Sequence, residues 1–213
     1  MRILRAAGYR VMPWKNGGGT TTEITVSPDG AGLDDFDWRV SMARVETGGP
    51  FSSFAGIDRT LCVLEGQGIV LDIAGEPPAE LIGPSAPFSF AADVPTAAAL
   101  ISGPITDLNV MTRRGRMTHT VERLTLATPL EIEARADTTL VLPLDGEIVL
   151  ASDAPERLGP LDALVLDRGA SSSTCRASWA EHAHPSCRRL PRHAVEERRR
   201  HDDRNHCFAR RRR

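Results

Sequence analysis

The chain has 213 residues, a net charge of −2, 41% hydrophobic residues and only 5% aromatic ones. This length allows one large domain or two small ones, with a core that must be mainly aliphatic. No apolar run approaches the roughly 18 residues needed to span a membrane, and the first residues lack the apolar stretch of a signal peptide, so we expect a cytoplasmic protein without membrane contact.

Charge is distributed unevenly along the sequence. Residues 1–174 carry 14 basic and 23 acidic side chains, a net charge of −9, whereas residues 175–213 carry 12 arginines and 5 acidic side chains, a net charge of +7. Residues 175–213 also hold five of the six histidines and three of the four cysteines. We therefore treat this Arg-rich tail separately from the rest of the chain.

The most unusual local composition lies in residues 14–20, which hold one of the three tryptophans, the only lysine and three successive glycines. Glycine allows backbone angles that other residues avoid. A β-branched run at residues 20–26 follows, so the glycines form a special connection into a first strand. The segment is either a plain surface turn or a backbone that passes close to a ligand or another strand and presents Trp14, Lys15 and Asn16.

After a turn at residues 27–30, residues 36–45 alternate as a strand does. Trp38, Val40 and Met42 fall on one face, and Arg39, Ser41 and Ala43 fall on the other. Because one face carries a tryptophan and the other an arginine, each face is a candidate for burial. Residues 51–59 have little periodicity and are interpreted as a loop with aromatic anchors.

The rest of the chain is predicted as short strands separated by glycine and proline turns. Two pairs of strands are predicted as β-hairpins, one joining residues 60–64 to 69–73 and one joining residues 140–144 to 147–151. The other predicted strands are residues 88–90, 97–102, 108–111, 119–127 and 130–134. No stretch has the periodicity of a long amphipathic helix.

An internal repeat relates the two halves of this region. Thr60-Leu61 and Ile69-Val70-Leu71 recur as Thr139-Leu140 and Ile148-Val149-Leu150, in each case 79 residues later. Gly83-Pro84 recurs as Gly159-Pro160, and residues 39–43 resemble residues 123–127. Short strands can look alike by chance, but the shared order favours two related β-sandwich or barrel units. The glycine pair at the predicted hairpin tip is typical of jelly rolls of the cupin type.

Five sequence blocks resemble the signature of the HutD/Ves family. They are Trp14-Lys15-Asn16-Gly17-Gly18-Gly19 with Thr22-Glu23-Ile24, Trp38-Arg39-Val40-Ser41-Met42-Ala43, Gly49-Pro50-Phe51-Ser52, Phe54 with Gly56-Ile57-Asp58-Arg59, and Asp107-Leu108-Asn109-Val110-Met111. The resemblance covers residues 10–111, and the second half is compatible with it to about residue 170. It implies an all-β double-cupin fold, with two jelly-roll barrels related by duplication, in a cytoplasmic bacterial protein. It also implies a link to histidine utilisation, as a sensor of a pathway acid such as urocanate or formylglutamate.

We accordingly expect a first cupin-like barrel at residues 1–114 and a second, incomplete unit at residues 115–174. The tail, residues 175–213, departs from the further strands that the family implies and lacks apolar periodicity, so we expect it to be disordered or aberrant. An altered reading frame is the preferred explanation. A basic nucleic-acid-binding arm and a metal site built from histidines and cysteines are less favoured alternatives.

Metal-dependent cupins need several histidines and a carboxylate aimed into the barrel, whereas residues 1–174 contain only His119. We therefore expect no metal and no other cofactor, and we interpret His119 as a surface or hydrogen-bonded residue. Cys62 lies in an apolar run and is expected to pack as a small hydrophobic residue. The glycine run lacks the ending of a phosphate-binding loop.

A site for a small carboxylic acid agrees better with the sequence, because arginine holds carboxylates through a planar fork. The resemblance makes Arg59 the first candidate for the ligand carboxylate, with a surface salt bridge to Asp58 or Glu46 as the alternative. The remaining ligand-binding candidates are Arg39, Ser41, Asn16, Trp14, Lys15 and Phe54. Asp107 and Asn109 rank lower, because turn or sheet-edge positions explain them equally well.

The expected function is therefore that of a non-catalytic, metal-independent protein that senses a small carboxylate and modulates histidine utilisation. The alternative is a metal-independent cupin enzyme, such as a small-acid or sugar isomerase, with Glu23 or His119 as general acid or base. We expect no nucleic-acid partner, and a homodimer is one expectation for the oligomeric state.

Overall fold

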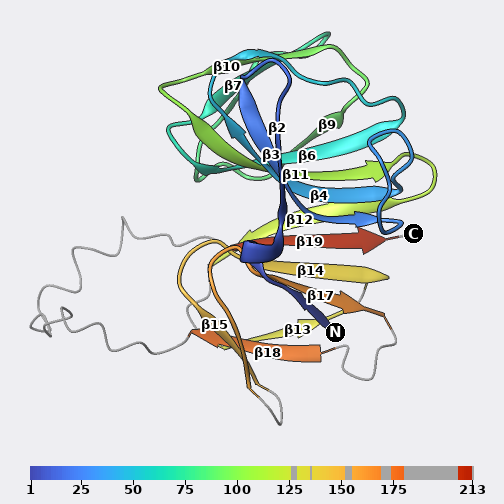
Figure 1. Cartoon of the computed structure of the whole chain (residues 1–213), viewed down its shortest axis with the longest axis vertical. Coiled ribbons are helices and arrows are strands. Elements are labelled where there is room, and N and C mark those ends of the chain that lie inside the picture. Colours follow the sequence, from blue (N-terminus) through green and yellow to red (C-terminus); the bar gives the residue numbers. More distant parts are fainter. Residues whose placement is uncertain (126–128, 135, 152–154, 169–173, 180–205, 213) are drawn as a thin grey trace, which may run out of the picture.

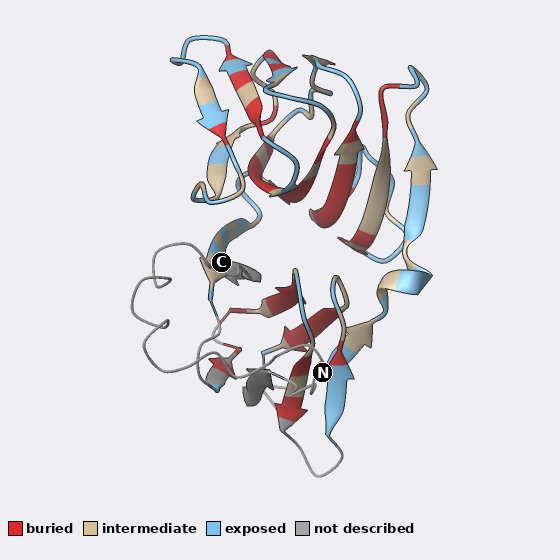
Figure 2. Ribbon diagram, turned by 90° about the vertical axis from the view of Figure 1, so that its left-hand side faces the viewer, coloured by how far each residue is buried: buried red, intermediate tan, exposed pale blue. Residues whose placement is uncertain are grey.

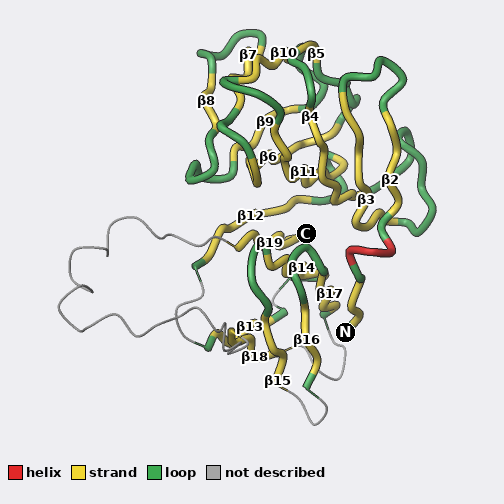
Figure 3. Tube along the Cα trace, turned by 60° about the vertical axis from the view of Figure 1, so that its left-hand side comes forward, coloured by secondary structure: helices red, strands yellow, loops and turns green. Residues whose placement is uncertain are grey.

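The computed structural model describes residues 1–125, 129–134, 136–151, 155–168, 174–179 and 206–212, whose strands form two stacked β-units (Figure 1). A short 3-10 helix, η1 (Ala6–Gly8), lies where the chain passes from one unit to the other (Figure 3). No helix within these ranges is long and apolar enough to cross a bilayer.

The first unit consists of two antiparallel sheets. The larger sheet has the strand order β2 (Arg10–Pro13), β3 (Gly19–Ser27), β4 (Trp38–Val45), β11 (Ile105–Arg113), β6 (Ile57–Glu65) and β9 (Phe88–Ala91). The smaller sheet has the order β5 (Gly49–Pro50), β10 (Thr96–Leu100), β7 (Ile69–Ile73) and β8 (Ala79–Leu81). The strands predicted at residues 20–27 and 36–45 are confirmed as β3 and β4.

The second unit is also built from two antiparallel sheets. The larger sheet has the order β1 (Arg2–Leu4), β17 (Ala163–Asp167), β14 (Thr138–Pro143), β19 (His206–Arg212) and β12 (Thr118–Leu124). The smaller sheet has the order β13 (Leu130–Glu133), β18 (Thr174–Trp179), β15 (Ile148–Ala151) and β16 (Glu156–Leu158).

The strand orders of the two units show the duplication that the sequence repeat predicts. The order β4-β11-β6-β9 of the first unit corresponds to β12-β19-β14-β17 of the second. The order β5-β10-β7-β8 likewise corresponds to β13-β18-β15-β16. The predicted similarity of residues 39–43 to residues 123–127 agrees with this match, because it relates β4 to β12.

The two predicted β-hairpins are wrong in their pairing, although their strands exist. β6 pairs with β11 and β9, whereas β7 pairs with β10 and β8, so the two strands lie in different sheets. β14 and β15 are separated in the same way. The glycines at the first connection explain the difference: Gly66 and Gly68 have φ angles of +91° and +128°, which let the chain turn from one sheet to the other.

The expected domain boundaries need correction at both ends. β1 pairs with β17, so residues 2–4 belong to the second unit although they precede the first unit in sequence. The second unit also takes β18 and β19 from beyond residue 173, in the places that β10 and β11 occupy in the first. Backbone pairing does not require apolar periodicity, which is why the Arg-rich sequence did not reveal these strands. The predictions for residues 180–205 lie outside the described residues.

The two large sheets face each other across a shared apolar core. Val40, Met42 and Leu108 of the first unit pack there with Leu140 and Leu142 of the second. Cys62 belongs to the same cluster, as the prediction of a buried apolar role requires. Buried residues, red in Figure 2, therefore lie both within the units and between them. Because the outer face of the larger first-unit sheet is covered in this way, its opposite face forms the interior of the first unit.

Candidate functional site

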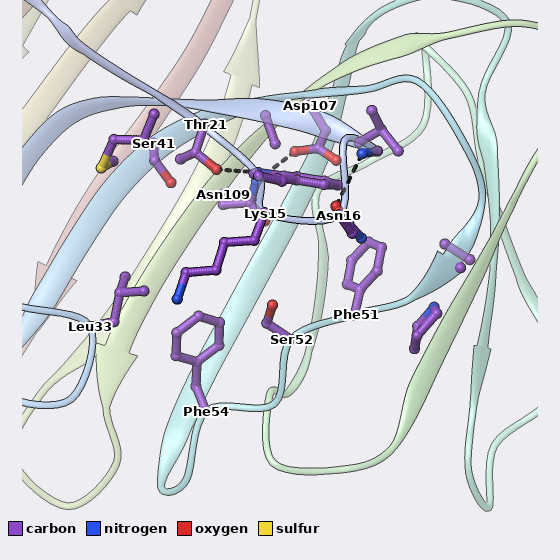
Figure 4. Close-up of a pocket in the computed structure, with 18 of the residues that line it drawn as sticks. Lys15, Asn16, Thr21, Leu33, Ser41, Phe51, Ser52, Phe54, Asp107 and Asn109 are labelled. Carbon is purple, nitrogen blue, oxygen red and sulfur yellow. Dashed lines mark hydrogen bonds between the residues drawn. The ribbon is translucent and has the colours of Figure 1, made fainter.

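A pocket of about 580 Å³ opens into the interior of the first unit (Figure 4). Its wall is the inner face of β4, β6 and β11, closed by the segments around residues 12–18 and 47–54. All seven residues predicted to bind a ligand line this pocket, namely Trp14, Lys15, Asn16, Arg39, Ser41, Phe54 and Arg59. The structure therefore brings together side chains from three separate sequence blocks.

Strand register sets the order of the polar side chains on the wall. Met111 on β11 lies opposite Arg39 on β4 and opposite Arg59 on β6, so the two arginines flank it in one row across the sheet. Two residues along β11, Asn109 lies opposite Ser41. Because successive side chains alternate between faces, these residues point inward while their neighbours enter the core between the units.

Arg39 is buried, with an exposed fraction of 4%. Arg39 is therefore not a solvent-facing side chain. Its Nε atom donates to Glu23 Oε2 at 2.8 Å, and its Nη1 atom donates to Ser41 Oγ at 3.4 Å. Glu23, one of the two predicted acid-base candidates, is thus engaged as the counterion of an arginine.

Arg59 is also buried, with an exposed fraction of 8%. Its Nε atom donates to Asn109 Oδ1 at 2.7 Å, and Nη2 donates to the same oxygen. The guanidinium carbon lies 4.7 Å from the centre of the Phe51 ring, within the range of a cation–π contact. The alternative of a surface salt bridge is wrong, because Asp58 pairs with Arg114 and Glu46 pairs with Arg44.

Arg59, Asn109 and Asp107 form one hydrogen-bonded line. Asn109 uses its oxygen to accept from Arg59 and its Nδ2 atom to donate to Asp107 Oδ1. Asp107 and Asn109 are 1% and 2% exposed and line the pocket. Both residues are more important than the sequence-based ranking predicts. An Asp-x-Asn pair inside the apolar strand at residues 105–111 was the available signal, since polar side chains are rarely buried without partners.

Burial changes the protonation of both ends of the line. Desolvation lowers the pKa of Arg59 to about 10, with Arg39 adding to the decrease and Asp107 opposing it, so Arg59 remains positive at neutral pH. Desolvation raises the pKa of Asp107 to about 6, against the opposing effects of Arg59 and the Asn109 hydrogen bond. A carboxyl group that titrates near neutral pH therefore lies inside the pocket.

The glycine segment passes close to another strand, as one of the two sequence interpretations predicts. A Cβ atom on Gly19 would lie 2.1 Å from the Arg44 carbonyl oxygen, and Gly17 has a φ angle of +72°. Asn16 Oδ1 accepts from the Gly18 backbone N–H at 3.0 Å, which leaves its amide nitrogen for the pocket. Trp14 Nε1 donates to Thr21 Oγ1 at 2.8 Å, which fixes the indole ring against the wall.

Apolar side chains and one lysine form the rim. Leu33 and Lys15 are exposed and Phe54 is half-buried, and all three line the pocket (Figure 4). The loop that carries Phe54 is anchored by Asp93, which accepts from the Gly56 N–H at 3.1 Å and pairs with Arg114. The hydrogen bond from Arg114 lowers the pKa of Asp93 to about 2, so this anchor stays charged at neutral pH.

His119 lies on the other side of the sheet and does not line the pocket. Its Nε2 and Nδ1 atoms lie 2.8 Å and 2.7 Å from the hydroxyl groups of Thr60 and Thr112, and burial lowers its pKa. The interpretation of a hydrogen-bonded histidine is confirmed. Within the described ranges no group of three histidine, cysteine or acidic residues has the arrangement of a metal site.

The second unit has no equivalent polar wall in its described residues. Its inner cluster is aliphatic, with Val141, Ile148, Leu164 and Leu166 among its members. At the repeat offset of 79 residues, Thr138 takes the position of Arg59. Among the side chains that the structure describes, the duplication has therefore kept the strands of both units but no counterpart of Arg59 in the second.

Comparison with known proteins gives a family match over most of the chain. The HutD family model matches residues 6–183, which also extends the family-like region past the expected limit at residue 175. An uncharacterized 21.2 kDa protein from the hutC 3′ region of Pseudomonas putida is 36% identical over 167 residues, covering 78% of this chain and 87% of that protein.

Two solved structures share the fold along nearly the whole chain. A conserved protein of unknown function from Pseudomonas aeruginosa PAO1 has a TM-score of 0.80 and 30% identity, covering 100% of this chain and 98% of that one. HutD from Pseudomonas fluorescens SBW25, in a structure described as its formate condition, has a TM-score of 0.75 and 30% identity, covering 99% and 97%. Bacillus subtilis oxalate decarboxylase, at 8% identity and a TM-score of 0.61, shows the cupin fold alone.

Proposed function

Because the chain belongs to the HutD family, which is linked to histidine utilisation, we propose that it is a non-catalytic sensor of a small carboxylic acid. The ligand occupies the first-unit pocket, and the ligand class is that of urocanate or formylglutamate. Binding modulates histidine utilisation in response to the concentration of that acid.

The observation that carries this proposal is the pair of buried arginines in one pocket. Burying two guanidinium groups is costly unless each is paired. Here Arg39 has Glu23 and Ser41 as partners, and Arg59 has Asn109. Among the described residues, the hydrogen bonds of Arg59 use Nε and Nη2 and those of Arg39 use Nε and Nη1. The remaining N–H groups are suited to a carboxylate. The formate condition of the related HutD structure is consistent with the same ligand class.

The rim suits the rest of such a ligand. Phe51, Phe54 and Trp14 offer flat apolar surface above the arginines, and Lys15 adds a positive charge near solvent. Apolar walls with a few convergent polar groups are typical of small-molecule sites. We therefore expect the carboxylate to bind deep in the pocket and the rest of the molecule to contact the rings.

Binding without catalysis is favoured over the alternative of a metal-independent enzyme. Glu23 is held by Arg39, and His119 contacts hydroxyl groups outside the pocket. A general acid or base must lie within hydrogen-bond reach of the proton that it moves, so neither candidate suits that role. Recovery of the ligand unchanged after prolonged incubation with the protein is the expected outcome, and a new product would support the enzyme instead.

Isothermal titration calorimetry with urocanate and with N-formylglutamate tests the proposal. Arg59→Lys keeps the positive charge but removes the fork, so we expect it to cost about 1.5–3 kcal/mol of binding free energy, or about ten- to hundredfold in affinity. Arg10→Lys is the matched control, because Arg10 is exposed on β2 and does not line the pocket. Absence of binding of both acids to the wild-type protein contradicts the proposal.

A further inference from the structure

A buried carboxyl group is unexpected in a pocket for anions, and Asp107 is such a group. It lines the same pocket as Arg39 and Arg59 and is 1% exposed. Asn109 connects it to Arg59: the amide oxygen accepts two hydrogen bonds from Arg59, and the amide nitrogen donates one to Asp107. The amide orientation is fixed by this arrangement, because its oxygen faces the guanidinium and its nitrogen faces the carboxyl group.

The charges that face Asp107 can be named for every packed element. Arg59 from β6 acts on Asp107 directly, Arg39 from β4 lines the same pocket with Glu23 from β3 as its counterion, and Lys15 lies at the exposed rim. The opposing small sheet contributes the apolar side chains Ile69, Leu71, Ile73, Leu81 and Ala98 to the interior. The two arginines therefore balance Glu23 and Asp107 when both acids are ionised, and the empty interior is close to neutral.

A bound carboxylate disturbs this balance. It adds one negative charge to the pocket that Asp107 lines, among polar side chains that are almost fully buried. Two carboxylates that share one site do not both remain ionised at low cost, because like charges raise the pKa of one of them. Burial already raises the pKa of Asp107 to about 6, so an added negative charge nearby favours its protonated form at neutral pH.

We propose that Asp107 is a positioning residue that holds Arg59 through Asn109 and takes up one proton when an anionic ligand binds. The proton comes from solvent and is carried on Asp107 Oδ2, while Oδ1 continues to accept from Asn109. The ligand is then the only negatively charged carboxylate near Arg59. The pocket thus binds a carboxylate together with a proton, and this inference rests on the proposed carboxylate-binding function.

The direction of the pH dependence follows from linkage. Affinity is lowest at a pH where Asp107 is ionised in both the free and the bound protein. As the pH falls toward about 6, the bound form takes up its proton first and affinity rises by up to tenfold per pH unit. Below that pH the free protein is protonated as well, and affinity no longer changes.

Calorimetry at pH 7.5 in HEPES and in Tris measures the proton directly, since the two buffers differ in ionisation enthalpy. N-formylglutamate and formate are the probes, because neither has a group that titrates between pH 6 and 8. We expect a net uptake approaching one proton per bound probe in the wild-type protein. Binding with no proton uptake and no change of affinity between pH 6 and 8 overturns this inference and leaves carboxylate binding intact. If neither probe binds, both the proton uptake and the proposed carboxylate binding are overturned.

Asp107→Asn separates the proton from the hydrogen bond. The asparagine oxygen still accepts from Asn109, so Arg59 stays in place, but no proton can be taken up. We expect pH-independent affinity, with binding at pH 8 as tight as that of the wild type at pH 6. Asp72→Asn, on the exposed side of β7, is the matched control and retains the wild-type proton uptake. If Asp107→Asn still takes up a proton on binding, the assignment of the proton to Asp107 is wrong. If that variant does not fold, the proton uptake of the wild-type protein is the test.

Discussion

At the residue scale, the molecule places opposite charges in the interior of the first unit, whereas the inner cluster described in the second unit is aliphatic. Arg59, Asn109 and Asp107 form one buried hydrogen-bonded line, and Arg39 with Glu23 forms a second pair. Buried polar groups that are fully partnered cost less than isolated ones but rarely stabilise a fold more than apolar packing does. Their presence is therefore better explained by ligand binding than by stability.

The raised pKa of Asp107 makes a prediction about stability that needs no ligand. Below about pH 4 the carboxyl group is protonated in both the folded and the unfolded chain and has no effect. Between the ordinary value of 3.8 and about 6 the folded state keeps a proton that the unfolded state loses, so stability falls as the pH rises. Above that range the free energy of unfolding is lower by roughly 2–3 kcal/mol.

Asp107→Asn removes this pH-dependent cost. In urea denaturation, the stability of Asp107→Asn relative to the wild type is expected to increase by roughly 2–3 kcal/mol from pH 4 to pH 7. Asp72→Asn provides the comparison, with a difference from the wild type that stays constant. A constant difference for Asp107→Asn as well would show that the buried carboxyl group titrates normally.

At the scale of elements, the site depends on how tightly β3 enters the sheet beside β4. Gly19 is the point of closest approach, since a Cβ atom there would overlap the Arg44 carbonyl oxygen at 2.1 Å. The partner is backbone and cannot rotate away, so any side chain at this position moves one strand relative to the other. Trp14 and Asn16 precede this contact and would lose their positions over the pocket.

Gly19→Ala is therefore expected to lower the free energy of unfolding by about 2–4 kcal/mol through overpacking. It should also weaken carboxylate binding in the fraction that folds. Gly83→Ala is the matched control, because no atom lies within 4 Å of its added Cβ; we expect a change within about 0.5 kcal/mol. Chemical denaturation of both variants provides the measurement, and equal stabilities would contradict the role of the close approach.

Sequence periodicity was sufficient to predict the strands and the two faces of β4, because apolar and polar residues alternate with the same period of two as buried and exposed positions in a strand. It was insufficient for strand pairing: β6 and β7 are adjacent in sequence but belong to different sheets, and glycines with positive φ angles, as at Gly66 and Gly68, occur in hairpin turns as well as in connections between sheets. The residues that line the pocket were predicted from the five sequence blocks that resemble the HutD/Ves family. Asp107 was ranked too low because Asn109 connects it to Arg59, which is 48 positions away in sequence, and this connection exists only after β6 pairs with β11.

At the scale of the whole molecule, the two units share one core between their large sheets. Leu142 is completely buried in that core and belongs to the second unit, whereas its neighbours in the cluster include Val40 and Leu108 of the first. β1 adds a further link, since the chain starts in the second unit before it builds the first. Each unit therefore covers apolar surface that the other would expose to water.

Leu142→Ala is expected to lower the free energy of unfolding by about 2–5 kcal/mol and to shift a single calorimetric transition that includes both units. Loss of carboxylate binding should coincide with that transition, although the pocket lies wholly in the first unit. Two separate transitions, with only the second-unit one shifted, would mean that the core between the sheets does not couple them.

The most direct test of carboxylate binding in the first unit is a crystal structure of the protein with bound N-formylglutamate. We predict a carboxylate of the ligand between Arg39 and Arg59, with the rest of the molecule beside Phe51 and Phe54. A ligand bound elsewhere on the molecule, or a carboxylate in the first-unit pocket that contacts neither arginine, would contradict the proposed site.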